Sequence, residues 1–129
     1  MADTWYFEGN DAVPAQERRD NFIQFLGSCA ASDADLASAG TIYGELVGNV
    51  VRHVGGPISV FCYWPEGYAT LCVRDYGHGF AYSRRRRAQV LSETGRGLYI
   101  VESLARHLDV ESGPWGCEVR AVLPVRKGR

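Results

Sequence analysis

Apolar residues recur three or four positions apart in two stretches of the chain, which predicts two helices. The first covers about 13–29, where Pro14 suits the first turn of a helix. The second covers about 33–53, with Ser32 and Asp35 typical of a helix start. Its predicted buried face is formed by Leu36, Ala39, Tyr43, Leu46, Val47, Val50 and Val54.

Shorter apolar and aromatic runs, several of them bounded by glycine or proline, predict five strands and one more helix. The expected strands are 4–8, 58–64, 68–74, 107–112 and 117–124, and the expected helix is about 98–107. This order predicts an α+β fold, a two-layer sandwich in which about three helices cover a mixed, mainly antiparallel sheet. No repeat or linker interrupts the chain, so residues 1–129 are expected to form a single domain.

Charge and cysteine content argue against several classes of partner and cofactor. Fourteen basic and fifteen acidic residues give a net charge of -1, so no nucleic-acid partner is expected. Neither a leader nor a run of eighteen apolar residues is present, which predicts a cytoplasmic protein without a membrane contact. The cysteines are scattered, which argues against zinc, and Cys62 and Cys72 are expected to be buried reduced thiols.

Glu45 and Asn49 stand four positions apart on the predicted long helix, so they share one face. Apolar neighbours indicate that this face is partly buried, where a carboxylate needs a polar or cationic partner. A magnesium–nucleotide complex is such a partner, since a carboxamide oxygen suits a hard cation and a carboxylate can activate a nucleophile. An ordinary exposed helix face explains the same spacing.

The segment Asp75-Tyr-Gly-His-Gly79 directly follows a predicted apolar strand. A carboxylate at a strand end can accept a hydrogen bond from an exocyclic amine such as that of adenine. Gly77 and Gly79 allow the backbone to approach a flat ligand closely. A plain turn is the alternative interpretation of this segment.

A third motif, Glu93-Thr-Gly-Arg-Gly-Leu98, opens the predicted helix 98–107. Backbone N–H groups and the dipole at a helix start favour phosphate, and Arg96 can add a charge-assisted contact. The segment lacks the third glycine of the dinucleotide fingerprint, because residue 100 is isoleucine, and the chain has no Walker loop. A loop that needs positive φ is the alternative.

Taken together and in this order, the three motifs resemble those of the histidine-kinase-like (GHKL) ATPase superfamily. Residues Glu45 to His53 resemble its N box, Asp75 to Gly79 its first glycine box, and Gly95 to Val101 its second. The resemblance covers nearly the whole chain. It is nearest to the small anti-sigma-factor serine/threonine kinases, and it implies the ATP-binding fold of the Bergerat type.

The resemblance implies a role for each matching residue, with ATP and Mg²⁺ as cofactors. Asn49 would coordinate Mg²⁺, Glu45 would be the catalytic base, and Asp75 would bind the adenine amine. Arg52 corresponds to a basic position that reaches the phosphates. The remaining ATP-binding positions would be Gly77, Gly79, Gly95, Arg96, Gly97 and Leu98.

Two features depart from the family pattern. Cys117 follows the glycine of the last predicted hairpin, where relatives often carry a threonine, and a thiol is a weaker hydrogen-bond partner. The residues from Phe80 to Thr94 would form a short ATP lid, and they include four arginines, Arg84 to Arg87. This run is either a solvated basic loop, a clamp on the triphosphate or a docking patch for an acidic partner.

The resemblance implies an ATP-dependent serine/threonine kinase that phosphorylates a small antagonist domain, can sequester a sigma factor, and can form a homodimer. A binding module that responds to nucleotide without catalysis is one alternative. A detached histidine-kinase catalytic domain is another, and a degenerate site that binds nothing is the last.

Overall fold

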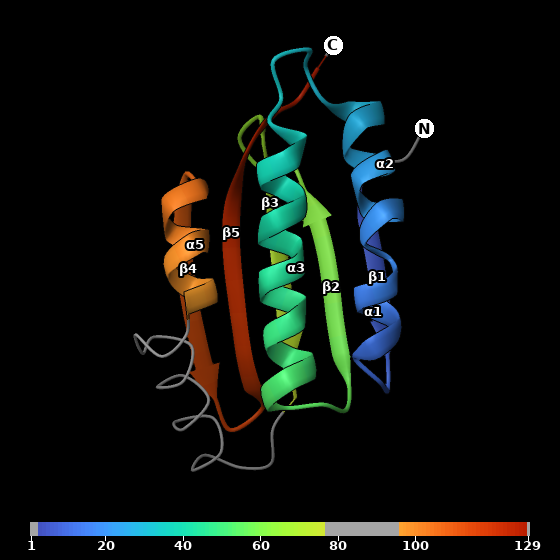
Figure 1. The fold of residues 1–129 in the computed structure, drawn as a ribbon, viewed down its shortest axis with the longest axis vertical. Helices are drawn as coiled ribbons and strands as arrows, with labels where there is room; N and C mark the ends of the chain where they lie inside the picture. Colours follow the sequence, from blue (N-terminus) through green and yellow to red (C-terminus); the bar gives the residue numbers. More distant parts are fainter. Residues whose placement is uncertain (1–2, 77–95, 129) are drawn as a thin grey trace.

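The chain folds into two layers, a sheet and a set of helices that lie over one of its faces (Figure 1). The structure is a computed structural model that describes residues 3–76 and 96–128. Its elements in chain order are β1 (Trp5–Gly9), α1 (Val13–Glu17), α2 (Arg19–Cys29), α3 (Leu36–His53), β2 (Ile58–Tyr63), β3 (Tyr68–Asp75), α5 (Arg96–Leu104), β4 (His107–Gly113) and β5 (Gly116–Arg126).

The five strands form one sheet in the order β1-β2-β3-β5-β4, and every described pairing is antiparallel. Strand β3 therefore lies at the centre, hydrogen-bonded to β2 on one side and β5 on the other. This arrangement confirms the predicted α+β two-layer sandwich. Each predicted strand lies within two residues of an observed one.

The predicted helix over 13–29 is two helices, because the chain breaks at Arg18 between α1 and α2. In a continuous helix the carbonyl of Ala15 would accept from the N–H of Arg19. Here that carbonyl accepts instead from the N–H of Arg18, at 3.2 Å, and from the buried hydroxyl of Tyr43, at 2.6 Å. A tertiary contact from α3 thus ends α1, and the local sequence does not predict this helix end.

Helix α3 begins at Leu36, three residues later than predicted. Asp35 is its N-cap: the carboxylate accepts from the N–H of Ser38 at 3.0 Å and from the Ser38 hydroxyl at 2.7 Å. These hydrogen bonds lower the pKa of Asp35. The helix then lies over the centre of the sheet (Figure 1) and contributes to the core the side chains of Ala39, Ile42, Tyr43, Leu46, Val47 and Val50.

The third predicted helix, over 98–107, is α5, which begins two residues earlier and ends at Leu104. It stops because the N–H of Arg106 donates to the carbonyl of Val122, at 2.8 Å, and His107 already pairs with Val122 as the first residue of β4. The predicted end of the helix at residue 107 was therefore wrong, whereas the predicted start of a strand at that residue is confirmed. Within the described residues, no helix is both long and apolar enough to cross a membrane.

We predict that Tyr43→Phe lowers the free energy of unfolding by about 1 kcal/mol. The change keeps the ring, which stacks on Phe22 with centroids 4.7 Å apart, but removes the hydroxyl that donates to Ala15. Urea unfolding followed by circular dichroism measures the loss. Tyr99→Phe is the control, because Tyr99 is 70% exposed; equal stability in the two variants would contradict the role of this hydrogen bond.

Candidate functional site

The C-terminal half of α3 brings together the polar side chains that the sequence singled out. Asn49 is 8% exposed, while the side chains of Glu45 and Arg52 are 30% and 54% exposed. The expected partial burial of this face is therefore confirmed. Asn49 lies at the edge of the core, and the two charged side chains lie nearer the solvent.

Arg52 lies back along the helix toward Glu45, with its Nη2 atom 4.0 Å from Glu45 Oε2. Gly48 makes this possible, because a Cβ at that position would come 2.9 Å from Arg52 Nη1. Sequence reasoning missed Gly48. The available signal was a glycine inside a helix, where it costs about 1 kcal/mol relative to alanine and therefore calls for a packing reason.

Asp75 is the last residue of β3 and is 2% exposed. Side chains alternate along a strand, so Asp75 shares the face of the buried Val73 and Leu71, which is the face that the helices cover. It pairs with Ile58 of β2 and with Cys117 of β5. Asp75 therefore projects from the middle of the sheet toward the helical layer.

Gly116 fits closely against the end of β3. Its φ is +139°, and a Cβ there would overlap the carbonyl oxygen of Asp75 and come 2.9 Å from Cα of Tyr76. Only glycine allows the β4–β5 turn to approach the backbone of Asp75 this closely. The sequence pointed to the turn but not to this contact.

The ends of several helices and strands lie at one end of the sheet (Figure 1). They are the C-terminal ends of α3 and β3, the N-terminal end of α5, and the turn between β4 and β5. Arg96, Gly97 and Leu98 form the first turn of α5, as a phosphate-binding helix start requires. The predicted positions Gly77, Gly79 and Gly95, the proposed lid 80–94 and Arg84 to Arg87 lie outside the described residues.

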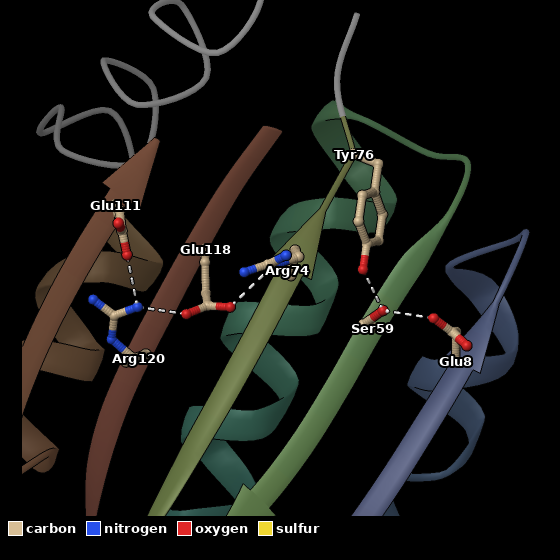
Figure 2. A network of polar contacts seen from close by, with 7 residues as sticks. All are labelled: Glu8, Ser59, Arg74, Tyr76, Glu111, Glu118 and Arg120. Atoms are coloured by element: carbon tan, nitrogen blue, oxygen red, sulfur yellow. Dashed lines mark hydrogen bonds and ion pairs between the residues drawn. The ribbon is translucent and has the colours of Figure 1, made fainter. Parts of the chain in front are cut away.

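The face of the sheet opposite the helices carries a polar network (Figure 2). The Glu118 side chain is 7% exposed and forms ion pairs with Arg74, at 3.0 Å, and with Arg120. The Trp115 ring lies 4.4 Å from the Arg74 guanidinium carbon, and hydrogen bonds to Asp109, Glu111 and Glu118 raise the pKa of Arg120. A nearly buried carboxylate is thus paired on both sides, as its desolvation demands.

The cysteines behave as the sequence predicted where their environment is described. Cys62 and Cys72 are buried and unbridged. Burial raises the pKa of both thiols, to about 12 for Cys72, so both stay protonated at neutral pH. Cys117 is 1% exposed and lies directly opposite Asp75 in the β3–β5 ladder. Cys117, the residue that departs from the family pattern, therefore lies beside Asp75, the carboxylate proposed to bind adenine.

In the described part of the chain, three open pockets lie around Arg106, at the far end of the sheet. Their volumes are about 440, 370 and 200 Å³, and Arg106 lines all of them. Tyr68, the first residue of β3, lines the two smaller ones and stacks on Arg106, whose guanidinium carbon is 3.9 Å from the ring centroid. Asp75 ends the same strand, so these pockets are separate from the residues described above.

Comparison with known families agrees with the fold and the motifs. A model of the histidine kinase-like ATPase domain matches residues 14–123. The chain therefore belongs to the histidine kinase-like ATPase domain family, a class whose shared property is ATP binding. A search of curated proteins gave no match.

We predict that Gly116→Ala destabilises the fold by about 3–5 kcal/mol, because it adds an overlap with the Asp75 carbonyl to the strain of positive φ. Gly67→Ala is the matched control: Gly67 has φ +86°, but nothing lies within 4 Å of its Cβ position. We expect it to lose only about 1 kcal/mol. Urea unfolding of both variants measures the difference, and equal losses would contradict the close approach.

Proposed function

We propose that this ATPase-family protein binds Mg-ATP and transfers its γ-phosphoryl group to a serine or threonine of a small antagonist protein. The observation that carries the proposal is that Glu45, Asn49 and Arg52 lie on the C-terminal half of α3. That helix ends at the same end of the sheet where β3 ends with Asp75 and where α5 begins (Figure 1). Base recognition, metal binding and phosphate binding then have separate groups within one site.

In this proposal the adenine amine donates to Asp75, which is fixed in the sheet centre. The phosphates lie at the N-terminal end of α5, where N–H groups of its first turn lack helical partners. Arg96, Gly97 and Leu98 form this turn. Gly95 is a further proposed phosphate contact, and Gly77 and Gly79 are proposed contacts of the adenine; all three lie outside the described residues. In this proposal the Arg52 side chain, which lies 4.0 Å from Glu45, leaves that carboxylate and contacts the phosphates when nucleotide binds.

The residues present suit a magnesium ion. Among the described residues no cluster of three or more His, Cys, Asp or Glu side chains offers a complete metal site. Mg²⁺ needs none, because it binds through one or two protein oxygens together with phosphate oxygens and water. The Asn49 carboxamide, 8% exposed, supplies such an oxygen. When bound, the ion would neutralise charge that develops on the phosphates.

Glu45 is the proposed general base of the transfer. Its carboxylate accepts the proton of the acceptor hydroxyl as that oxygen forms a bond to the γ-phosphorus. The bond between the γ-phosphorus and the β,γ-bridging oxygen breaks, and ADP leaves. The side chain suits this role because it is 30% exposed, so an acceptor from another protein can reach it.

The proposed protein partners follow from the resemblance to the anti-sigma-factor kinases. They are an antagonist domain that carries the acceptor, a sigma factor that the protein sequesters, and a second copy of the chain. In this scheme phosphorylation of the antagonist decides which partner is bound, so the nucleotide site controls the exchange of partners.

We predict that Glu45→Gln lowers phosphate transfer by about 10²- to 10⁴-fold while ATP affinity changes by less than about 3-fold, because the amide cannot take a proton. Transfer from [γ-³²P]ATP to a candidate antagonist domain measures the rate, and calorimetry measures the affinity. Glu66→Gln is the matched control, since Glu66 is exposed in the β2–β3 turn.

Three results would contradict the proposal in different ways. Equal transfer by Glu45→Gln and wild type would exclude Glu45 as the base. ATP binding without any phosphoprotein would indicate a non-catalytic, nucleotide-responsive module. Acid-labile phosphate on the acceptor would indicate a histidine acceptor.

A further inference from the structure

Asp75 and Tyr76, the first two residues of the first glycine box, point to opposite faces of the sheet. Asp75, 2% exposed, faces the helices. Tyr76 follows it and lies on the open face, where Figure 2 shows its hydroxyl directed at Ser59. The functions discussed above use the first of these side chains and leave the second without a role.

The Tyr76 hydroxyl oxygen lies 2.6 Å from Ser59 Oγ, and Ser59 is 6% exposed. Ser59 Oγ in turn lies 3.3 Å from Glu8 Oε2. An ionised carboxylate only accepts hydrogen bonds, so the single serine proton goes to Glu8 and the tyrosine must donate to the serine. The result is a directed chain of hydrogen bonds from β3 across β2 to β1 (Figure 2).

These side-chain hydrogen bonds connect β3 to β2 beyond the end of the backbone ladder between the two strands. The pairing of β2 with β3 ends at Ile58 and Asp75. Tyr76 is one residue past that last pair, and it reaches back diagonally to Ser59, which pairs with Arg74. The side-chain bond thus continues the connection to β2 at the residue where the ladder has stopped.

On the side away from β2, Asp75 and Tyr76 contact β5. Cys117 pairs with Asp75, and Gly116 packs against the backbone of Asp75 and Tyr76. One step earlier, Arg74 is fixed by Glu118 at 3.0 Å. The Asp75 backbone is therefore restrained on the β5 side by main-chain packing. On the β2 side it is restrained by its pairing with Ile58 and, one residue further on, by the Tyr76 hydroxyl.

We propose that Tyr76, held by Ser59, is a positioning residue for the Asp75 carboxylate and so sets the preference of the site for adenine. The inference rests on the proposed nucleotide site. A hydrogen bond to an exocyclic amine weakens steeply as its angle departs from linearity. Release of the β3 end on one side therefore weakens recognition of the base, while the contacts to phosphates, which come from α3 and α5, are unchanged.

The test compares ATP with inosine triphosphate, which carries a carbonyl where adenine carries its amine. In Tyr76→Phe we expect ATP affinity to fall about 3- to 10-fold, as loss of a hydrogen bond's contribution implies, while affinity for inosine triphosphate stays within about 2-fold. Calorimetry of the full chain with magnesium gives both values. Tyr68→Phe, the same change at the other end of β3, is the matched control and should leave both affinities unchanged.

Ser59→Ala should produce the same fall in the ATP preference, and the double variant Tyr76→Phe with Ser59→Ala should be no worse than either single one. An unchanged preference in Tyr76→Phe would overturn the proposal. An equal loss for both nucleotides would also overturn it, because a merely structural role weakens the site as a whole.

Amide hydrogen exchange in the nucleotide-free protein separates this inference from the proposed function. Faster exchange at residues 74–76 in Tyr76→Phe, but not in Tyr68→Phe, is expected if the hydroxyl restrains the strand end. Unchanged exchange would overturn the restraint, whatever the protein binds. A wild-type chain that binds neither nucleotide would overturn the proposed function and the adenine preference together, while the exchange result would still decide the restraint.

Discussion

The packing of α3 on the sheet is the constraint on which the other features depend. Its apolar face, including Tyr43 and Val47, is fully buried over the central strands. That burial stabilises the fold through the hydrophobic effect, at about 25 cal/mol for each Å² of apolar surface. It also fixes the rotation of the helix, so that Asn49 lies at the core edge and Glu45 farther out. Through the Tyr43 hydroxyl, the same helix determines where α1 ends.

The central place of β3 is the second condition. A carboxylate on an edge strand would have a neighbour on one side only, whereas Asp75 stands between β2 and β5. On the open face, Glu118 is nearly buried between Arg74 and Arg120, and the pairs compensate the desolvation of its charge. The sheet thus carries a nearly buried carboxylate on each face, Asp75 toward the helices and Glu118 on the open face. Its central strand fixes the direction in which Asp75 projects.

Much of the fold could be predicted because hydrophobic periodicity reports directly on burial. The strands and α3 follow from it, and their observed limits differ by a few residues. The break at Arg18 could not be predicted, because it depends on the hydroxyl of Tyr43, which lies 28 positions along the chain from the Ala15 carbonyl that it binds. The bond from Tyr76 to Ser59 requires the strand register, which one sequence does not supply. Of the candidate site, α3 and Asp75 are where the motifs implied, while their roles in binding and catalysis remain predictions, as do those of Gly77, Gly79 and Gly95.

The central claim is that α3, the end of β3 and the start of α5 form one adenine-nucleotide site. Calorimetric titration of the wild-type chain with ATP, with and without Mg²⁺, tests it most directly. The account predicts one site per chain, with tighter binding when magnesium is present and weaker binding of ADP. Absence of binding heat, together with a thermal midpoint that ATP does not raise, would contradict it.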